Sequence, residues 1–552
     1  MAIKKIKIDN FKKFQKFELD FDNGLNILVG DNEVGKSTIL EAIHLALTGM
    51  INGKYLNTEL TQYLFNNGAV QAYIDSLSTN NRMLPPRIKI ELFFNSAEVP
   101  ALFMGNIENA HNDNDAHGFA FIIELTDNDE YQELLRLGNI KTLPIEYYDY
   151  KWVTFADKTI TPKTIPIKSA LIDSSLARYQ NGSDVYISRI VKQGLEDSER
   201  VKVAQAHRGL LEKFASDPSV DEINKKINDT AKISGKNIAL SVELLSKNAW
   251  ENSLVTCVDD IPFHYIGKGE QCIIKTRLAL SDKKAKEASI ILMEEPENHL
   301  TYARLNQLLD FIVTDCEDRQ IIVSTHSSFV ANKLGIDNLT ILGRNDSKQK
   351  MENLPEKTAK FFKKLSGFDT LRLVLAKSVI LVEGPSDELV LQKAYMLANN
   401  GKLPIADGVD VINARGLTFL NLLELAQSVG KKVVVVTDND GKLAALEEKY
   451  ADYLGDNSKY NVLISYDKCD HTPDNEVIKD YNYNTLENLI LVANGLNGLN
   501  TILGTSCKDE NSIRKFMKKE KTDCALAIFE YEGEVEIKFP NYIAEAIKYV
   551  NE

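Results

Sequence analysis

Two uninterrupted apolar runs in the C-terminal third end abruptly in acidic residues. Residues 379–387 read VILVEGPSD, and residues 433–440 read VVVVTDND. Short all-apolar runs of this kind predict strands that are buried on both faces of a parallel sheet. The carboxyl ends of parallel strands share one edge of the sheet, where ligands bind in such folds. We therefore expect the acids that follow the two runs to converge at that edge.

The acids at the ends of these runs are candidate metal ligands. They are Glu383, Asp387, Asp438 and Asp440. Carboxylates crowded together repel one another, and a divalent cation relieves that repulsion. A set of oxygen ligands with no nearby His or Cys favours Mg²⁺ or Mn²⁺ over zinc. Taken singly, each motif is equally consistent with an ordinary strand end whose acids are solvated.

The N-terminal pattern predicts three strands followed by a phosphate-binding loop. Residues 2–29 read as three strands, with an Asp-Asn-Gly turn before the third, and residues 30–38 (GDNEVGKST) match G-x-x-x-x-G-K-S ahead of a helix-forming segment. In this pattern glycine amides wrap the phosphates, the lysine reaches the terminal phosphates, and the serine hydroxyl ligates Mg²⁺ at a helix N-terminus. The predicted site for ATP with Mg²⁺ comprises Gly30, Asn32, Gly35, Lys36, Ser37 and Thr38.

This opening pattern resembles the heads of the ABC-type ATPases of the SMC, RecF and Rad50 group, which implies further motifs downstream. Residues 289–300 (SIILMEEPENHL) are similar to a Walker B strand, in which Glu294 supports Mg²⁺ and Glu295 polarises the attacking water. Glu294 departs from the usual Asp, so we expect hydrolysis to be slow rather than absent. His326 ends the next apolar strand, where the family places a switch histidine near the γ-phosphate; a capped strand end is the alternative.

A looser match precedes the Walker B strand. Gly267, Gly269 and Gln271 stand before a helix-forming stretch and look like a degraded Ser-Gly-Gly-x-Gln signature, which caps the nucleotide of the opposite head in these ATPases. The match implies a head-to-head sandwich with two nucleotides, and a plain loop-to-helix junction is the alternative. The Q-loop residue stays open between Gln62 and Gln71.

The segment 187–248 changes in character to a charged, helix-favouring sequence. Its apolar residues recur at spacings of three and four, which predicts a helical hairpin. The segment is far too short for the long coiled coil of SMC or Rad50 proteins. We expect a compact insertion that mediates dimerisation, and the alternative is a monomeric helical lid, because amphipathic helices usually pack on their own domain.

The acidic motifs of the C-terminal third resemble the Toprim domain, the metal-binding module of topoisomerases, bacterial primases and a group of nucleases. Its pattern is a hydrophobic strand followed by Glu-Gly, and later a strand that ends in Asp-x-Asp, as at 383–384 and 438–440. Farther on, Glu487 opens a helix-forming stretch after Thr485, a candidate N-cap. A site with two ions needs about five carboxylates, and Glu487 supplies the fifth.

Residues 512–519 (SIRKFMKK) predict an amphipathic helix with its apolar and basic residues on opposite faces. Its basic face is a candidate for phosphate contacts, and a solvated surface is the alternative. Lys521 follows this stretch and is a candidate to stabilise charge that develops on a scissile phosphate.

An ABC-type head with a short helical insertion and a Toprim domain in one chain resembles the OLD (overcoming lysogenisation defect) family of nucleases. The resemblance implies cleavage of DNA with two Mg²⁺ or Mn²⁺ ions, regulation by bound nucleotide, and a homodimer or higher oligomer. It also implies anti-phage defence, alone, with a helicase-like partner, or with a retron reverse transcriptase and its satellite DNA. The family's metal ligands carry over to Glu383, Asp387, Asp438, Asp440 and Glu487, and its catalytic lysine to Lys521.

The predicted fold is α/β: an ABC/SMC-like P-loop ATPase with a helical dimerisation insertion, followed by a Toprim α/β domain. A chain of 552 residues exceeds what a single core supports. The predicted boundaries are 1–186 for the N-terminal part of the ATPase, 187–248 for the insertion, 249–345 for the rest of the ATPase, 346–370 for a linker, and 371–552 for the Toprim domain with a C-terminal extension.

Composition narrows the function classes. The six cysteines are scattered without a C-x-x-C pair, which argues against a structural zinc site and hence against a primase. The chain has neither a long apolar segment nor a signal-peptide pattern, so we expect a cytoplasmic protein with no membrane contact. The formal net charge of −14 is unfavourable for tight DNA binding by the chain alone and favours engagement of DNA with a partner's help.

Two other functions use the same motifs. A topoisomerase would require a transesterifying tyrosine and strand-passage domains, for which the sequence offers no candidate region. A structural ATPase clamp of the SMC or RecF kind would bind DNA without cutting it and would carry a non-cleaving Toprim domain.

Overall fold

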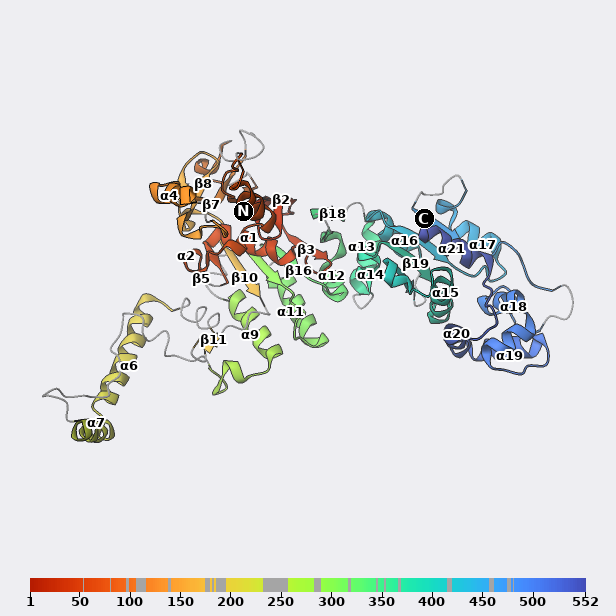
Figure 1. Ribbon diagram of the computed structural model, residues 1–552. Helices are drawn as coiled ribbons and strands as arrows, with labels where there is room; N and C mark the ends of the chain where they lie inside the picture. Colours follow the sequence, from red (N-terminus) through yellow and green to blue (C-terminus); the bar gives the residue numbers. More distant parts are fainter. Residues whose placement is uncertain are drawn as a thin grey trace. The chain divides into compact units, whose positions relative to one another are not determined.

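The computed structural model describes most of the chain (Figure 1). The described residues are 1–52, 54–79, 81–95, 99–105, 116–137, 140–173, 179–180, 183–184, 195–231, 257–281, 289–315, 319–343, 346–351, 354–365, 369–414, 419–455, 461–473, 478–479 and 481–552. They form two compact units. The first holds Met1–Thr325 and Arg344–Asp346, and the second holds His326–Gly343 and Ser347–Glu552.

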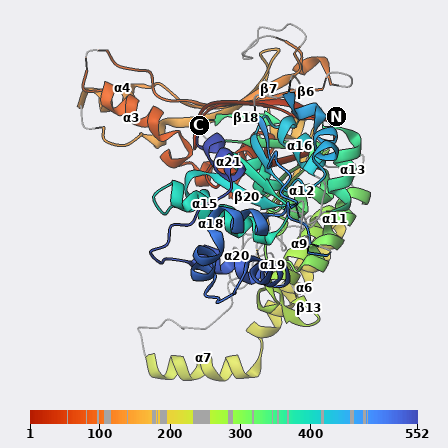
Figure 2. The ribbon, with the colours of Figure 1, turned by 90° about the vertical axis from the view of Figure 1, so that its right-hand side faces the viewer.

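An antiparallel sheet begins the first unit, and its first two strands are those that the N-terminal pattern predicts. Beyond one part of this sheet, α3 (Asn67–Ser76) and α4 (Asp129–Leu137) lie side by side (Figure 2), joined by a hydrogen bond between the hydroxyls of Tyr73 and Tyr131. The strand order is β2 (Phe14–Asp20), β1 (Ile3–Phe11), β6 (Ile88–Phe94), β7 (Gly118–Leu125), β8 (Tyr148–Thr154) and β9 (Thr159–Ile160).

A parallel sheet in the same unit carries the nucleotide motifs. Helix α1 (Lys36–Thr48) contacts strands of both sheets, and its apolar residues are buried. The Gln320 side chain also joins the sheets: it accepts from the Ile3 N–H at 2.8 Å and donates to the carbonyls of Ile3 and Asp22. The parallel strands run in the order β10 (Ser169–Asp173), β15 (Ile290–Glu294), β16 (Gln320–Ser324) and β3 (Leu25–Gly30).

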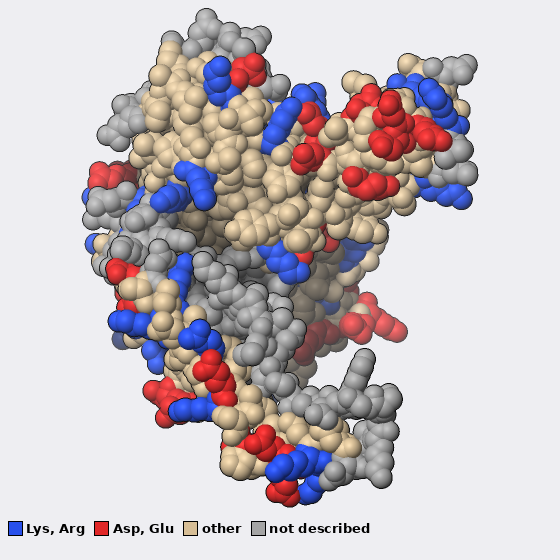
Figure 3. Space-filling model, turned by 90° about the vertical axis from the view of Figure 1, so that its left-hand side faces the viewer, with Lys and Arg blue, Asp and Glu red and all other residues tan. Residues whose placement is uncertain are grey.

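Two of the predicted helices are present, α6 (Asp197–Ala215) and α7 (Pro218–Ala231), but α7 runs across the direction of α6 rather than alongside it as in a hairpin (Figure 2). The rest of the expected insertion lies outside the described residues. Charges of both signs alternate along the two helices (Figure 3), as in the ion pair between Lys226 and Glu222. Apolar side chains are nevertheless exposed, with Leu210 65% and Phe214 50% accessible. The role of this insertion in dimerisation stays a prediction.

Helices α9 (Lys268–Ser281) and α11 (Tyr302–Asp315) follow in the first unit, and short helices and strands begin the second unit. Helices α9 and α11 flank β15 in sequence. In the second unit, α12 (Ser328–Leu334) is followed by the antiparallel pair β17 (Leu339–Leu342) and β18 (Lys348–Lys350), and then by α13 (Glu356–Lys364). The segment 346–370, expected as a linker, therefore contains regular structure.

The second unit is built on a four-stranded parallel sheet. Its order is β20 (Val409–Asn413), β19 (Ser378–Val382), β21 (Lys432–Val436) and β22 (Val462–Ser465). The connection from β19 passes to one side and the later strands add on the other. The topological switch point therefore falls between β19 and β21, the two strands that the apolar runs predict.

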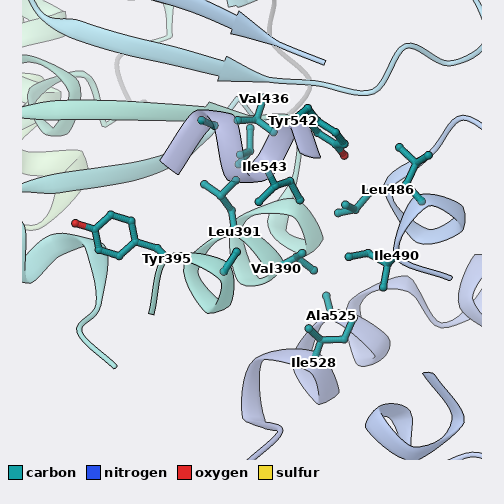
Figure 4. Packing of buried hydrophobic residues seen from close by; sticks show 14 of the residues in the cluster. Val390, Leu391, Tyr395, Val436, Leu486, Ile490, Ala525, Ile528, Tyr542 and Ile543 are labelled. Carbon is teal, nitrogen blue, oxygen red and sulfur yellow. The ribbon is translucent and has the colours of Figure 1, made fainter. Parts of the chain in front are cut away.

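Helices cover both faces of this sheet. On one face, α15 (Pro385–Ala398) and α21 (Asn541–Asn551) pack against the strands and against each other, while α14 (Thr370–Leu375) and α16 (Phe419–Ser428) pack on the other. The first face continues into a core that α18 (Leu486–Leu503), α19 (Glu510–Lys519) and α20 (Lys521–Glu530) complete (Figure 4). Among the described residues, none of the helices is both long and apolar enough to cross a membrane.

We predict that a methyl group at Gly495 destabilises the second unit. Gly495 has φ 68° and ψ 169° where the two halves of α18 meet, a conformation that costs a residue with a Cβ about 1–3 kcal/mol. Urea unfolding of Gly495→Ala should therefore shift to lower denaturant concentration. Gly498→Ala is the matched control, because Gly498 is helical and a Cβ there would meet only Asn494 at 3.8 Å. It should be stabilised by about 0.5–1 kcal/mol, and equal shifts would contradict the argument.

Candidate functional site

The loop between β3 and α1 has the geometry of a phosphate-binding loop. Gly35 has a φ of 101°, and a Cβ at this position would lie 2.3 Å from Cζ of Phe14, so only glycine fits. The Lys36 ammonium donates hydrogen bonds to the carbonyls of Gly30 and Asp31, both at 2.9 Å. These bonds hold the lysine inside the loop, where a lysine can meet the phosphates of a nucleotide.

The acids that follow β15 lie in the electrostatic environment of Lys36. Burial lowers the pKa of Lys36, and the negative charges of Glu295, Asp31 and Glu294 partly offset that effect. Glu295 adopts a positive φ of 41°, and its N–H donates to the carbonyl of Ser324 at 2.9 Å. The predicted Walker A lysine and the two predicted Walker B acids are therefore brought together, although they are separated by more than half of the first unit's sequence.

The other residues predicted for the nucleotide site lie around the same elements. Asn32 is exposed in the loop, and Ser37 and Thr38 are half-buried in the first turn of α1. His326 follows β16 by two residues and is exposed. The roles of these four residues toward a nucleotide stay predictions.

The signature-like segment has a structural explanation as well. Gly267 directly precedes α9 and is exposed, whereas a Cβ on Gly269 would lie 2.6 Å from the carbonyl oxygen of His299. The Gln271 side chain is buried and donates to two backbone carbonyls of the segment before the helix. Packing alone accounts for Gly269 and Gln271, so the role of this segment toward an opposite head stays a prediction.

In the second unit, acidic side chains from four points of the chain gather at the carboxyl edge of the sheet. Glu383 follows β19, Asp387 lies in the first turn of α15, Asp438 follows β21, and Glu487 lies in the first turn of α18. The first three line a cavity of about 10 Å³, together with polar groups from Thr437 and Tyr542 and apolar groups from neighbouring helices. This volume is about that of one water-sized group.

Hydrogen bonds orient these carboxylates. Asp387 Oδ2 accepts from the N–H of Gly384 at 2.9 Å, so the side chain caps its own helix. Asp438 Oδ2 accepts from the N–H of Leu486 at 3.0 Å. Thr485 occupies the N-cap position of α18, but its side chain makes no capping bond, and Asp438 caps that helix instead. The Thr437 hydroxyl donates to Glu383.

Crowding in a poorly solvated place raises the pKa values of two acids. Burial raises the pKa of Asp387 to about 6, and the charge of Glu383 adds to this, whereas the bond from Gly384 opposes it. Burial raises the pKa of Asp438 well above its usual value, and the charges of Asp387 and Glu383 contribute. The site therefore has a surplus of negative charge that a cation would relieve.

The predicted catalytic lysine lies at this site. The Lys521 ammonium forms an ion pair with Glu487 at 2.7 Å. Burial lowers the pKa of Lys521, but the hydrogen bond and charge of Glu487, with the charges of Asp438 and Asp387, outweigh burial and raise it. Lys521 therefore stays protonated beside the carboxylates, although half of its side chain is accessible.

Asp440 does not join the other acids, in contrast to the expectation that it points the same way as Asp438. The strand ends at Val436, and Asp440 has a φ of 52°, so the alternation of an extended chain does not apply. Its side chain is exposed and accepts from the Asn482 amide at 2.8 Å. The buried Asn439 side chain, which donates to two backbone carbonyls of the loop after β22, fixes this turn.

The donor set fits a hard divalent cation in type but does not form a finished coordination sphere. Oxygen ligands predominate, and the raised pKa values show a demand for positive charge. Within the described part of the chain, however, no three His, Cys, Asp or Glu side chains lie in an arrangement that could hold an ion as they stand. Two features explain why the carboxylates do not form an ion-binding arrangement as they stand. Glu487 is paired with Lys521, and Asp440 points away from the other acids.

The sequence prediction missed two side chains of this site. Thr437 directly precedes Asp438 and could have been inferred from its place at the end of the apolar run. Tyr542 offers no such signal, because it lies 104 residues beyond Asp438, to which its hydroxyl donates at 3.4 Å. The basic helix is present as α19, but the Arg514 guanidinium is largely buried on Asn488 and the ring of Tyr483 rather than on the solvated face.

Two family models match the chain. One is described as an AAA ATPase domain and matches residues 1–331. The other is described as the TOPRIM domain of proteins like the overcoming lysogenization defect protein, and it matches residues 374–440. The second match includes Glu383, Asp387, Asp438 and Asp440, and it ends before Glu487 and Lys521.

Several curated proteins are similar to parts of this chain. A protein of Helicobacter pylori named ATP/GTP phosphatase is 23% identical over 350 residues, which are 59% of this chain and 85% of that protein. The DNA replication and repair protein RecF of Clostridium novyi is 32% identical over 93 residues, 17% of this chain and 24% of RecF. RecF of Lactococcus lactis subsp. lactis is 51% identical over 49 residues, 9% of this chain and 14% of RecF.

Solved structures of SMC heads are similar at a low level. A head bound to the C-terminal winged-helix domain of ScpA has a TM-score of 0.34 at 15% identity and covers 64% of this chain and 99% of that chain. The SMC head domain from Thermotoga maritima has a TM-score of 0.27 at 13% identity, with 62% and 94% covered.

The first family model spans more than half of the chain, and the order of its match and the Toprim match is the one that the sequence predicts. The predicted fold class, a P-loop ATPase followed by a Toprim α/β domain with a parallel sheet, is confirmed. The chain belongs to the family of this AAA ATPase domain, and with its Toprim domain it has the architecture of the OLD nucleases.

Proposed function

We propose that the chain is an ATP-binding, divalent-metal-dependent DNA endonuclease or nickase of the OLD type. The observation that supports this function most directly is the gathering of Glu383, Asp387, Asp438 and Glu487 around Lys521 at the edge of the parallel sheet. Four carboxylates and the Lys521 ammonium lie at a topological switch point, where ligands bind in such sheets. This arrangement suits hydrolysis of a phosphodiester, in which cations stabilise the attacking and the leaving oxygen.

The residues would divide the work as follows. The acids Glu383, Asp387, Asp438 and Glu487 would hold Mg²⁺ or Mn²⁺, with Asp440 joining after it turns away from Asn482. Two bound ions would supply Lewis-acid stabilisation of the attacking and leaving oxygens. The ion pair of Lys521 with Glu487 supports a role for this lysine at the scissile phosphate, where an ammonium would stabilise the charge that develops on oxygen.

The nucleotide site would regulate this activity. Lys36 is held beside Glu294 and Glu295, an arrangement that suits Mg²⁺-bound ATP. Glu295 would orient the attacking water, and Glu294 in place of the usual Asp favours slow hydrolysis. His326, Gly267 and Gly269 would contact the phosphates, the last two from an opposite head.

The partners would be DNA and further copies of the chain. The exposed apolar side chains of α6 and α7 are available for dimerisation. The net charge of −14 favours DNA binding assisted by a partner, such as a helicase-like protein or a retron reverse transcriptase with its satellite DNA, in an anti-phage defence role. The lysines in the last turn of α19, together with Lys521, would offer basic side chains to the phosphates of DNA.

One further function is favoured by a specific observation. Asp440 is held by Asn482, and the described residues contain no finished coordination sphere. Both facts suit a DNA-binding ATPase clamp of the SMC or RecF kind with a non-cleaving Toprim domain. Such a clamp would bind DNA in a nucleotide-dependent manner and leave it uncut.

We expect the purified chain to nick or cleave plasmid DNA in Mn²⁺, and substitution of the acids to abolish the activity. Glu383→Ala and Asp438→Ala should each lower the cleavage rate at least about 100-fold, because each removes a ligand of the proposed ions. Gel electrophoresis of supercoiled plasmid, with and without ATP, measures this. Cleavage that survives both substitutions would remove the nuclease assignment, and DNA binding without cleavage by the wild type would favour the clamp.

Lys36→Ala serves as the control for this experiment. It should weaken ATP binding and change the effect of ATP on cleavage, while Mn²⁺ binding to the carboxylates stays at the wild-type level. Loss of Mn²⁺ binding in Lys36→Ala would contradict the assignment of two separate sites.

We also predict that Asp387 destabilises the metal-free protein at neutral pH. Its pKa is raised to about 6, against 3.8 without the folded environment. Its contribution to stability is therefore fully present below about pH 3.8 and is lost as the pH rises through 6. At pH 7.5 in EDTA, Asp387→Asn should be more stable than the wild type by on the order of 3 kcal/mol and should therefore unfold at a higher temperature. At pH 5 the difference should shrink, and Mn²⁺ should reverse it.

Asp470→Asn is a control in which the expected change in stability has the opposite sign, because the pKa of Asp470 is lowered rather than raised. Hydrogen bonds from Asn484 and Thr472 lower the pKa of Asp470 to about 2, so its contribution is present above pH 3.8 and is lost only as the pH falls through 2. Asp470→Asn should therefore lower the unfolding temperature at both pH 5 and pH 7.5. The argument fails if both variants respond to pH in the same way.

The basic face of α19 should contribute to DNA affinity. Charge reversal at Lys518 and Lys519, which are exposed in the last turn of the helix, should weaken DNA binding and reduce the slope of log affinity against log salt by about 2. Fluorescence anisotropy over a salt series measures both. Lys363→Glu with Lys364→Glu, an exposed pair in the last turn of α13, makes the same change in net charge elsewhere. Identical slopes in the two double variants would leave α19 as ordinary surface.

A further inference from the structure

The last helix of the chain reaches the carboxylate site. Tyr542, in the first turn of α21, is 5% exposed, and its ring lies at the edge of the apolar cluster beside Val436 (Figure 4). Its hydroxyl donates to Oδ1 of Asp438 at 3.4 Å. The Ser465 hydroxyl at the end of β22 donates to the backbone carbonyl of Tyr542 at 2.7 Å, so the backbone that carries the ring is itself fixed to the sheet.

Asp438 is therefore held from two directions. The N–H of Leu486, at the start of α18, binds Oδ2, and the hydroxyl of Tyr542 binds Oδ1. A carboxylate with one donor on each oxygen has a defined plane and keeps further lone pairs on both oxygens for a cation. Both donors to Asp438 come from helices that lie far from it in sequence, α18 and α21.

The chemistry of the donor suits the task. A phenol hydroxyl orients a carboxylate without neutralising it, whereas a lysine or arginine at the same place would compete with a cation for the charge. Tyr542 belongs to a buried apolar cluster, and Leu391, Val436 and Ile543 of that cluster line the cavity beside Asp438, which limits the access of water to the carboxylate. Groups that orient metal ligands in this way commonly change metal affinity 10–100-fold when they are removed.

We infer that Tyr542 is a positioning residue that sets the plane of the Asp438 carboxylate for a divalent cation, so that α21 is part of the nuclease site. This inference rests on the proposed function. It assigns to the C-terminal helix a role that neither the Toprim motifs nor the family match, which ends at residue 440, includes.

Calorimetric titration of the full chain with Mn²⁺ alone tests the inference. Tyr542→Phe keeps the ring and removes the hydroxyl, and it should bind Mn²⁺ at least about 10-fold more weakly than the wild type. Tyr395→Phe is the matched control, since its hydroxyl donates to Asp407 in the same unit, away from the acids. Ile547→Val loosens α21 one turn beyond Tyr542 without touching a hydroxyl. Both controls should keep the wild-type affinity.

A second measurement distinguishes a specific effect of the Tyr542 hydroxyl on Asp438 from a general loss of stability in Tyr542→Phe. The unfolding temperature in EDTA is compared for Tyr542→Phe, Asp438→Asn and the double variant. If the hydroxyl acts through the carboxylate, the two effects do not add. Additive effects would overturn the inference, as would wild-type Mn²⁺ affinity in Tyr542→Phe or an equal loss in Ile547→Val. A wild-type chain that binds no Mn²⁺ would overturn the proposed function, and the inference with it.

Discussion

The second unit depends on one constraint: several carboxylates must remain close together where water is scarce. The order β20-β19-β21-β22 sends the chain to opposite sides after β19, so the carboxyl ends of β19 and β21 face the same crevice. Glu383 and Asp438 follow these ends, and two helix starts add Asp387 and Glu487. Burial raises the pKa values of Asp387 and Asp438, and the charges of the neighbouring carboxylates raise them further.

Local hydrogen bonds make the crowding tolerable without removing it. Asp387 caps α15 and Asp438 caps α18, so two acids serve as structural caps as well as candidate ligands. Lys521 neutralises Glu487 and leaves the acids nearer the sheet without an ionic partner of their own among the described residues. A site built in this way is stable enough to fold and still favours binding of a divalent cation, since the ion relieves repulsion that the fold has already imposed.

The strongest patterns in the sequence predicted both sheets' central features. An apolar run that ends in Glu-Gly or Asp-x-Asp specifies a buried strand and its exit, and the G-x-x-x-x-G-K-S match specifies a loop whose Gly35 has no room for a Cβ beside Phe14. The prediction failed where local chain geometry decides. Strand alternation predicted that Asp440 would lie beside Asp438. The strand ends at Val436, however, and Asp440 itself adopts a left-handed conformation in which its side chain binds Asn482.

Long-range contacts explain the rest of what the sequence could not indicate. Tyr542 and Asp438 meet because α21 packs across β19, β21 and β22, an arrangement fixed by apolar burial rather than by any motif. The same applies to Leu486, whose backbone N–H binds Asp438 while its side chain is an ordinary core residue. The groups that orient Asp438 are a backbone N–H and the hydroxyl of a buried tyrosine. They leave no distinctive pattern in the sequence, because leucine and tyrosine are ordinary core residues at such positions. The acids can therefore be found from sequence, whereas the groups that orient them require the fold.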